Sequence, residues 1–353
     1  MPLIMQRGYT ETACIREHRT CHTVAACDAS SPCITIGLIN NMPDAALGQT
    51  EQQFSELIDS AAQDIPVRLM LYSLPNIFRS ESAQQHLNKS YFPINELWNS
   101  QCDALIITGT EPRQPNLSEE AYWPVLGEVF EWAKTNTHST VVSCLAAHGA
   151  VLYNDGIERH RLSDKQSGVF EFNRTPGHAL TRQAAEIVRI PHSRWNEVRE
   201  DDLVSCGYTV LAKSADAGVD MFVKECKQSL FVHFQGHPEY SARTIFKEYR
   251  RDIGRFLRNE RDTYPSMPQG YFDKNGRRLA EDFQEFALSL RNQECLASFP
   301  YDVLANTLQN TWQSSSTRTY RNWLQCVRSR KAAASSLVAM PDLNQLQQKR
   351  TAA

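Results

Sequence analysis

TVVSCLAAHGA, residues 140–150, joins a short apolar run to a cysteine and then to small residues that can open a helix. The run before Cys144 is typical of a buried strand, and a sharp turn from such a strand into a helix lifts a side chain out of the sheet. A helix N-terminus there favours the thiolate form of a cysteine. Cys144 is therefore a candidate nucleophile, although most cysteines at strand ends are buried small hydrophobic residues.

A second apolar run ends in the segment FQGHPE, residues 234–239, which offers a base and a carboxylate close together. His237 is a candidate general base, and Glu239 is a candidate partner that orients it. Cysteine, histidine and glutamate together make a nucleophilic triad. Taken alone, His237 is better explained as a core histidine bonded to a backbone carbonyl, and Glu239 as a solvated surface charge; the combination with Cys144 favours the triad.

Strand-like and helix-like patterns alternate along the first half of the chain. Such βα alternation predicts an α/β fold in which helices flank a mostly parallel sheet, with a site at the carboxyl ends of the strands. A capping-box pattern, Thr50 followed by Gln53, predicts where the first helix begins. The expected strands are 34–39, 67–74, 104–108 and 140–144, and the expected helices start at Thr50 and cover 123–133.

The second half of the chain carries shorter strand signals that lie close together. Their spacing predicts antiparallel strands added to the parallel core, at 185–190, 208–212, 218–223 and 230–234. Amphipathic patterns predict helices at 241–258 and 279–290, and the chain past about Arg328 is expected to fray. We therefore expect a flexible N-terminal extension at 1–33, a catalytic domain at 34–262, and a C-terminal helical extension with a polar tail at 263–353.

Composition excludes several classes of protein. The chain has 353 residues, and its 37 Lys and Arg against 40 Asp and Glu give a formal charge of -3, which indicates no nucleic-acid partner. No apolar stretch is long enough to span a membrane, and the N-terminus does not resemble a secretory signal, so the expected location is the cytoplasm. Ten cysteines include no close CxxC pair, and no metal site is expected. Four of them lie in residues 14–33 beside His18 and His22, where weak metal or oxidation chemistry is an alternative to a flexible extension.

Several motifs occur in an order and spacing that resemble the homoserine O-acyltransferases, which include the homoserine O-succinyltransferases. The resemblance covers about residues 34–262, and it implies a flavodoxin-like fold similar to that of class I glutamine amidotransferases. The motifs are Met42-Pro43, Thr50-Glu51, Leu105-Ile106-Ile107-Thr108-Gly109, Tyr122-Trp123, Cys144, Lys165, Gly168-Val169-Phe170, Pro191-His192-Ser193-Arg194, Gly236-His237-Pro238-Glu239-Tyr240, Glu248 and Arg251-Asp252.

The resemblance implies a CoA-dependent acyl transfer in amino-acid biosynthesis, specifically that of methionine. In that family a cysteine takes the acyl group from an acyl-CoA, and a histidine then activates the hydroxyl of the acceptor amino acid. By matching position, Cys144 is the nucleophile, His237 the base and Glu239 its partner. Succinyl-CoA is favoured over acetyl-CoA as the co-substrate, homoserine or a similar hydroxy amino acid is the acceptor, and no bound cofactor is expected. The expected partners are these small molecules, and a homodimer is left open.

Three further positions match residues that hold the acceptor in the family. Lys165 and Arg251 match cations that bind the carboxylate of the amino acid, a role that suits a lysine point charge and an arginine fork. Ser193 matches a position in the substrate site. Each has an ordinary alternative: a polar loop for Lys165, a solvated helix face for Arg251, and a turn for Ser193.

The chain also departs from the family pattern around the expected oxyanion hole. Asp44 and the residues after it stand where family members have a lysine, and the loop to Thr50 is expected to be longer. The backbone amide of Leu145, which follows the nucleophile, remains a candidate oxyanion donor. Arg113 occupies the position where a glycine accompanies succinyl transfer and a glutamate accompanies acetyl transfer. It is expected either to pair with the free carboxylate of a succinyl donor or to point into solvent.

Two other functions remain open from the sequence. A glutamine amidotransferase also uses Cys, His and Glu, but residues 142–146 lack the glycines that flank the nucleophile in that group. A non-catalytic binding protein on the same fold would explain the altered segment after Pro43, whereas the intact set of Cys144, His237 and Glu239 argues against it.

Overall fold

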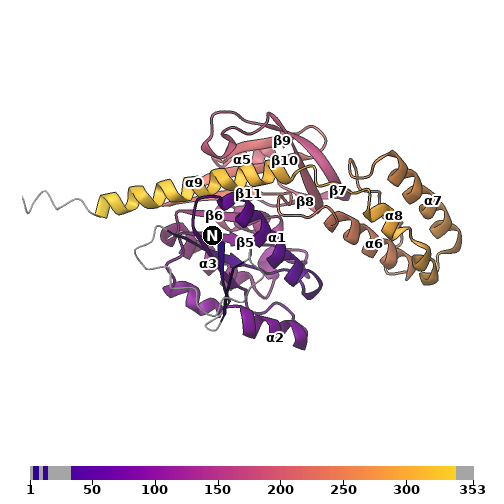
Figure 1. Ribbon diagram of the computed structural model, residues 1–353, viewed down its shortest axis with the longest axis horizontal. Coiled ribbons are helices and arrows are strands. Elements are labelled where there is room, and N and C mark those ends of the chain that lie inside the picture. Colours follow the sequence, from indigo (N-terminus) through magenta and orange to yellow (C-terminus); the bar gives the residue numbers. More distant parts are fainter. Residues whose placement is uncertain (1–2, 8–10, 15–32, 339–353) are drawn as a thin grey trace, which may run out of the picture.

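A mixed sheet of eleven strands runs through the protein (Figure 1). The structure, a computed structural model, describes residues 3–7, 11–14 and 33–338. The strand order is β2-β1-β4-β3-β5-β6-β11-β10-β9-β7-β8. The bounds are β1 Leu3–Arg7, β2 Glu11–Cys14, β3 Ile34–Ile39, β4 Val67–Tyr72, β5 Ala104–Ile107, β6 Ser139–Ser143, β7 His160–Arg174, β8 Ile187–Glu197, β9 Thr209–Ser214, β10 Gly218–Cys226 and β11 Ser229–Phe234.

The centre of the sheet is parallel and one flank is antiparallel. Strands β1, β4, β3, β5, β6 and β11 pair in parallel, whereas β10, β9, β7 and β8 extend the sheet with antiparallel pairs. In β3, the neighbouring residues Leu38 and Ile39 point to opposite faces and are both fully buried, one in each core, as expected for a strand covered on both faces. The predicted fold class, a parallel α/β sheet with added antiparallel strands, is confirmed.

Helices cover both faces of the parallel region. Phe54 of α1 and Trp323 of α9 share one core with the sheet, and Phe130 of α3 shares another core with Ala147 of α4 on the other face. The α-helices are α1 Asp44–Ala62, α2 Glu81–Ser90, α3 Trp123–Asn136, α4 Leu145–Asp155, α5 Glu200–Ser205, α6 Thr244–Leu257, α7 Lys274–Leu290, α8 Tyr301–Ala305 and α9 Gln313–Val338, and the 3-10 turns are η2 Ile94–Asn99, η3 Leu117–Glu119, η4 Ala179–Thr181 and η5 Gln293–Ser298. The sheet is thus held between α1 with α9 and α3 with α4.

Helices α6, α7 and α8 build a smaller core at one end of the molecule (Figure 1). Phe246 of α6, Phe283 of α7 and Leu304 of α8 are buried within it. Helix α6 follows the amphipathic pattern predicted for 241–258, and it begins just after the His237-Pro238-Glu239 segment. This lobe therefore places one face of α6 against the candidate site.

The N-terminal segment is in part a component of the sheet. Strand β1 pairs in parallel with β4, and Leu3 and Met5 are buried in the main core. The prediction of a flexible extension is wrong for these residues, because their alternate apolar side chains are buried in a strand that pairs with β4 on one side and β2 on the other. Residues 15–32, which include Cys21, Cys27 and the two N-terminal histidines, lie outside the described part of the chain.

The C-terminal helix continues beyond the point where fraying was expected. Helix α9 runs to Val338. The guanidinium of Arg330 donates two hydrogen bonds of 2.9 Å to the carboxylate of Glu225, and Lys331 Nζ lies 2.8 Å from Asp103 Oδ2. The prediction of fraying from Arg328 is wrong, because charged side chains on the last turns find partners on the sheet. The boundary at residue 262 stays a prediction.

The first helix begins earlier than its capping-box pattern predicted. Helix α1 starts at Asp44, directly after Pro43, whose φ of -61° suits a helix start. Thr50 and Gln53 lie inside the helix, and Gln53 Nε2 donates to Thr244 Oγ1 at 2.5 Å. The predicted start at Thr50 and the expected loop after Met42-Pro43 are therefore both wrong.

Replacing Trp323 with alanine is expected to destabilise the protein by about 3–5 kcal/mol, the cost of removing a large side chain from a core. Trp323 is 2% exposed, and its Nε1 donates to Ser139 Oγ at 2.9 Å. The free energy of unfolding, measured by urea denaturation, tests this. Arg318→Ala on an exposed position of the same helix is the control, expected to change stability by less than about 0.5 kcal/mol. Equal stability of the two variants would contradict the inclusion of α9 in the main core.

Candidate active site

Cys144 sits at a sharp turn between β6 and α4. Its φ of 53° and ψ of -115° put a non-glycine residue in a region that proteins tolerate mainly at functional sites. The amide of Cys144 donates to the carbonyl of Phe234 at 2.7 Å, so the ends of the parallel neighbours β6 and β11 are joined. This joint brings the segment after β11, which contains His237, beside the thiol.

The structure brings Cys144, His237 and Glu239 together as a relay. His237 Nδ1 lies 2.8 Å from Glu239 Oε1, and both side chains are buried. Because the carboxylate accepts, Nδ1–H donates and Nε2 is left to face Cys144, which raises the pKa of the imidazole. The backbone amide of His237 donates to Pro191 O at 2.8 Å, and the Tyr240 ring stacks on the imidazole at 4.0 Å. The base is thus fixed on several sides.

Electrostatics favour the protonated form of His237. Burial by itself lowers the pKa of the imidazole, but the negative charges of Cys144 and Glu239 outweigh burial and raise this pKa well above its usual value. The protonated imidazole is therefore stabilised beside Cys144 and Glu239. This charge arrangement suits a cysteine nucleophile paired with a histidine.

A cluster of charged side chains lies on the α6 side of the relay. Lys165 Nζ is 2.8 Å from Asp252 Oδ2 and 3.6 Å from Glu248 Oε2. Ser193 Oγ donates to Glu248 Oε2, and Arg251 Nη2 donates to Asp252 Oδ1 at 3.2 Å. The three residues that the sequence proposed for acceptor binding therefore meet in one place.

Two carboxylates organise this cluster, and their roles were missed from the sequence. Glu248 and Asp252 lie four residues apart on α6 and so face the same side. Burial raises the pKa of Asp252, but Lys165 and Arg251 outweigh it and hold the pKa below its usual range. The hydroxyl of Tyr240 donates to Glu248 Oε1 at 2.8 Å, and its ring touches His237. Tyr240 therefore connects the charged cluster to the base.

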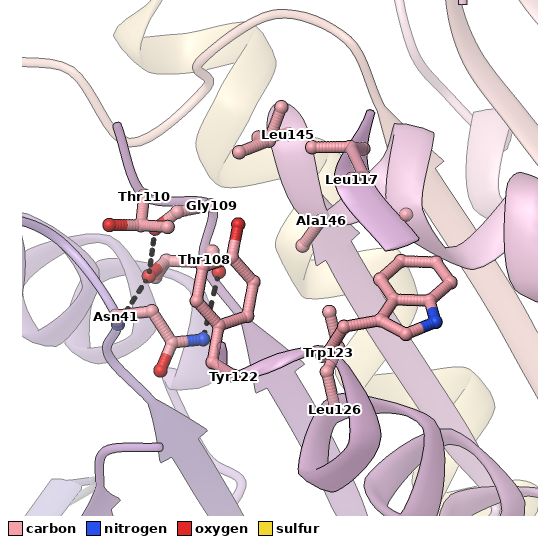
Figure 2. Close-up of a pocket in the computed structure, with 11 residues that line it drawn as sticks. Asn41, Thr108, Gly109, Thr110, Leu117, Tyr122, Trp123, Leu126, Leu145 and Ala146 are labelled. Atoms are coloured by element: carbon pink, nitrogen blue, oxygen red, sulfur yellow. Dashed lines mark hydrogen bonds between the residues drawn. The ribbon is translucent and has the colours of Figure 1, made fainter. Parts of the chain in front are cut away.

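A small pocket lies beside the nucleophile, between the loop after β5, the first turn of α4 and helix α3 (Figure 2). A Cβ atom at Gly109 would lie 2.7 Å from Leu145 Cβ and 3.0 Å from Leu145 N. Glycine therefore lets the loop approach the backbone amide of Leu145, which as a first-turn N–H has no intrahelical acceptor. The buried hydroxyl of Tyr122 also lines the pocket and has no hydrogen-bond partner among the described residues.

Comparison with known proteins decides the family. The family model for homoserine O-succinyltransferase matches residues 2–333. Homoserine O-succinyltransferase from Rhodopseudomonas palustris is 42% identical over 296 residues, which cover 84% of this chain and 89% of that protein. The chain belongs to the homoserine O-succinyltransferase family. The same-named protein from Bradyrhizobium japonicum is 41% identical over 292 residues, or 82% of this chain and 89% of that protein.

Solved structures with lower similarity include a glutamine amidotransferase from Thermotoga maritima, with 12% identity, a TM-score of 0.47, and coverage of 83% of this chain and 98% of that chain. Another is a glutamine amidotransferase from Methylobacillus flagellatus, with 12% identity, a TM-score of 0.46, and coverage of 84% of this chain and 96% of that chain.

Membership in the homoserine O-succinyltransferase family makes this enzyme an acyltransferase. This membership decides against the amidotransferase interpretation of the sequence.

This chain departs from the pattern of the homoserine O-succinyltransferase family at Asp44 and Arg113, and the structure shows what each residue contacts. Asp44 Oδ2 accepts from the amide of Ser80 at 2.7 Å, and Asp44 Oδ1 lies 3.3 Å from Arg79 Nη1. The exposed Arg113 lies over the Phe78 ring at 5.0 Å, and its amide donates to Glu120 Oε1 at 2.5 Å. Asp44 therefore ties the start of α1 to a neighbouring loop, and the role of Arg113 toward the donor stays a prediction.

Among residues 3–7, 11–14 and 33–338, no three His, Cys, Asp or Glu side chains are grouped as metal ligands. The polar groups of the site are instead paired with one another, as for His237 with Glu239 and Lys165 with Asp252. These residues suit nucleophilic attack by Cys144 with proton transfer through His237.

Proposed function

We propose that this protein transfers the succinyl group of succinyl-CoA to the hydroxyl of homoserine through an acyl-enzyme on Cys144, as a step of methionine biosynthesis. The observation that carries the proposal is the relay of Cys144, His237 and Glu239 at a strand-to-helix turn in a member of the homoserine O-succinyltransferase family. Mass spectrometry of the acylated enzyme tests it. A non-catalytic protein would have no need for the positive φ of Cys144.

In the first half-reaction the thiolate of Cys144 attacks the thioester carbonyl of succinyl-CoA. The N–H of Leu145 donates to the oxyanion, the role of the residue after the nucleophile in such turns. When the tetrahedral intermediate collapses, the bond to the CoA sulfur breaks and His237 gives its proton to that sulfur. The enzyme then carries a succinyl thioester on Cys144.

In the second half-reaction the neutral His237 accepts the hydroxyl proton of homoserine. An unassisted hydroxyl at neutral pH is a poor nucleophile, so it must lose its proton as it attacks. The new ester bond forms as the bond to Cys144 Sγ breaks. Glu239 keeps the imidazole in the required tautomer and stabilises it while it is charged.

The charged cluster matches the two ends of an amino acid. Lys165 and Arg251 suit the carboxylate of homoserine, and Glu248 suits its ammonium group. Ser193 and Tyr240, which both donate to Glu248, keep that carboxylate in place beside the base. A zwitterion bound here would extend its hydroxyl toward His237.

Replacing Lys165 with alanine is expected to raise the KM for homoserine at least about tenfold, the effect of losing one charge-assisted contact. Acylation of Cys144 by succinyl-CoA without acceptor should keep its wild-type rate. Steady-state kinetics and single-turnover acylation measure the two effects. Lys213→Ala, which removes an exposed lysine paired with Glu200, is the matched control. A slower acylation in Lys165→Ala with an unchanged KM for homoserine would contradict the assignment.

The described helices include none that is long and apolar enough to cross a bilayer. The cytoplasmic location, the homodimer and the pairing of Arg113 with the donor carboxylate stay predictions.

A further inference from the structure

A second cavity of about 580 Å³ lies next to the pocket beside the nucleophile. Leu117 lines both, so the two are neighbours. The second cavity is bounded by the 112–117 segment after β5, by one face of α4, and by the start of β7. Its volume falls within the range of pockets that hold drug-sized ligands and cofactors. The established parts of the mechanism do not use this space.

Two guanidinium groups converge on this cavity. Arg159 Nη2 donates to Pro115 O at 2.9 Å, while its Nη1 is buried without a hydrogen-bond partner in the part of the chain that the structure describes. Arg161 lies over the ring of Trp195 at 4.4 Å, which holds it in place. One carboxylate, Glu158, lines the same cavity. Burial lowers the pKa of Arg159, and the neighbouring charge of Arg161 also lowers it, against the opposite effects of Tyr122, Glu120 and Glu158.

His148 also lines the cavity, but its Nδ1 has no surface accessible from it. Gln235 Oε1 accepts from the amide of Val198 at 2.9 Å, so it also accepts from His148 Nε2, which lies 2.9 Å away. The proton of the imidazole is therefore on Nε2, and burial lowers the pKa of His148 to about 3, which keeps the ring neutral. Nδ1 is buried with a bare lone pair and no partner among the described residues.

We propose that this cavity holds the CoA portion of the acyl donor, with the pyrophosphate at Arg159 and Arg161. The proposal rests on the proposed function, because it deepens the donor side of that site. Guanidinium forks match phosphate oxygens in shape and charge, and a bound anion relieves the repulsion between the two arginines. A donor held in this way passes Leu117 and presents its thioester to Cys144.

Arg161→Ala tests the proposal on an exposed side chain. We expect the KM for succinyl-CoA to rise about tenfold, as for the loss of one charged hydrogen-bonding group, with kcat and the KM for homoserine unchanged. With succinyl-N-acetylcysteamine, a thioester without nucleotide or phosphates, wild type and Arg161→Ala should react equally. Arg161→Lys should recover part of the affinity. Arg189→Ala, which removes an exposed arginine of β8 that pairs with Glu171 of β7, should behave as wild type.

Calorimetric titration with free CoA makes the test independent of acyl transfer. Wild type should bind CoA about tenfold more tightly than Arg161→Ala. Equal CoA binding by the two proteins, or an equal loss of activity with the truncated thioester, would overturn the cavity assignment. If wild type binds CoA with the expected dependence on Arg161 but transfers no succinyl group, the proposed function fails while the cavity assignment stands.

Discussion

Cys144→Ser is expected to lower kcat for succinyl transfer by about 10,000-fold or more, the scale seen when the nucleophile of such a relay is removed. A serine hydroxyl at this turn lacks the charge that the thiolate contributes beside His237, and that charge is one of the causes that raise the pKa of His237. Steady-state kinetics with succinyl-CoA and homoserine measure the loss. The unfolding midpoint should stay near that of wild type, because the substitution changes one partly exposed atom.

A matched cysteine separates the site from general effects of the substitution. Cys206 is also partly buried and ends helix α5, away from the relay. Cys206→Ser should retain wild-type kcat and KM. If Cys144→Ser kept activity within about tenfold of Cys206→Ser, a difference of only about 1.4 kcal/mol in the barrier, then Cys144 would not be the nucleophile.

Glu239→Gln is expected to lower kcat by about 1,000-fold and to change its pH dependence. The amide can present its N–H to Nδ1 and favour the wrong tautomer of His237, an effect worth several orders of magnitude in comparable relays. The charge of Glu239 also raises the pKa of His237. Without it that pKa falls, so the alkaline limb of the pH profile, where His237 loses its proton, should move to lower pH.

The pH profile distinguishes this role from a structural one. Glu239→Asp, which keeps the charge, should recover part of kcat and keep the alkaline limb near its wild-type position. Glu171→Gln, at an exposed glutamate paired with Arg189, is the control for loss of one negative charge. An alkaline limb that stays in place in Glu239→Gln would show that Glu239 does not set the protonation of His237.

The parallel part of the fold was predictable because its signals are local. Continuous apolar runs such as Ile34–Ile39 are buried on both faces and need no distant partner to be recognised. Strand β7, His160–Arg174, was missed because its first residues are mostly exposed and carry no apolar face. Helix α9 was missed because its polar residues, among them Arg330 and Lys331, are stabilised by carboxylates more than a hundred positions away.

The order of the motifs was enough to identify the residues of the candidate site. It was not enough to predict the role of a residue when that role depends on the side chain with which it pairs. The structure brings Cys144, His237 and Glu239 together, as the resemblance implied. Glu248 and Asp252 matched the motif order of the family, but no role could be assigned to them, because a sequence does not show which cation faces which carboxylate. The cavity at Arg159 and Arg161 was missed for the same reason, since only the folded chain brings these residues beside His148.

The direct test of the mechanism is mass spectrometry of wild-type enzyme incubated with succinyl-CoA without acceptor, quenched in acid and digested. The peptide that contains Cys144 should gain the mass of one succinyl group, and added homoserine should remove that group with formation of O-succinylhomoserine. A Cys144 peptide that stays unmodified while the enzyme turns over, or a succinyl group on another residue that homoserine discharges, would contradict the account.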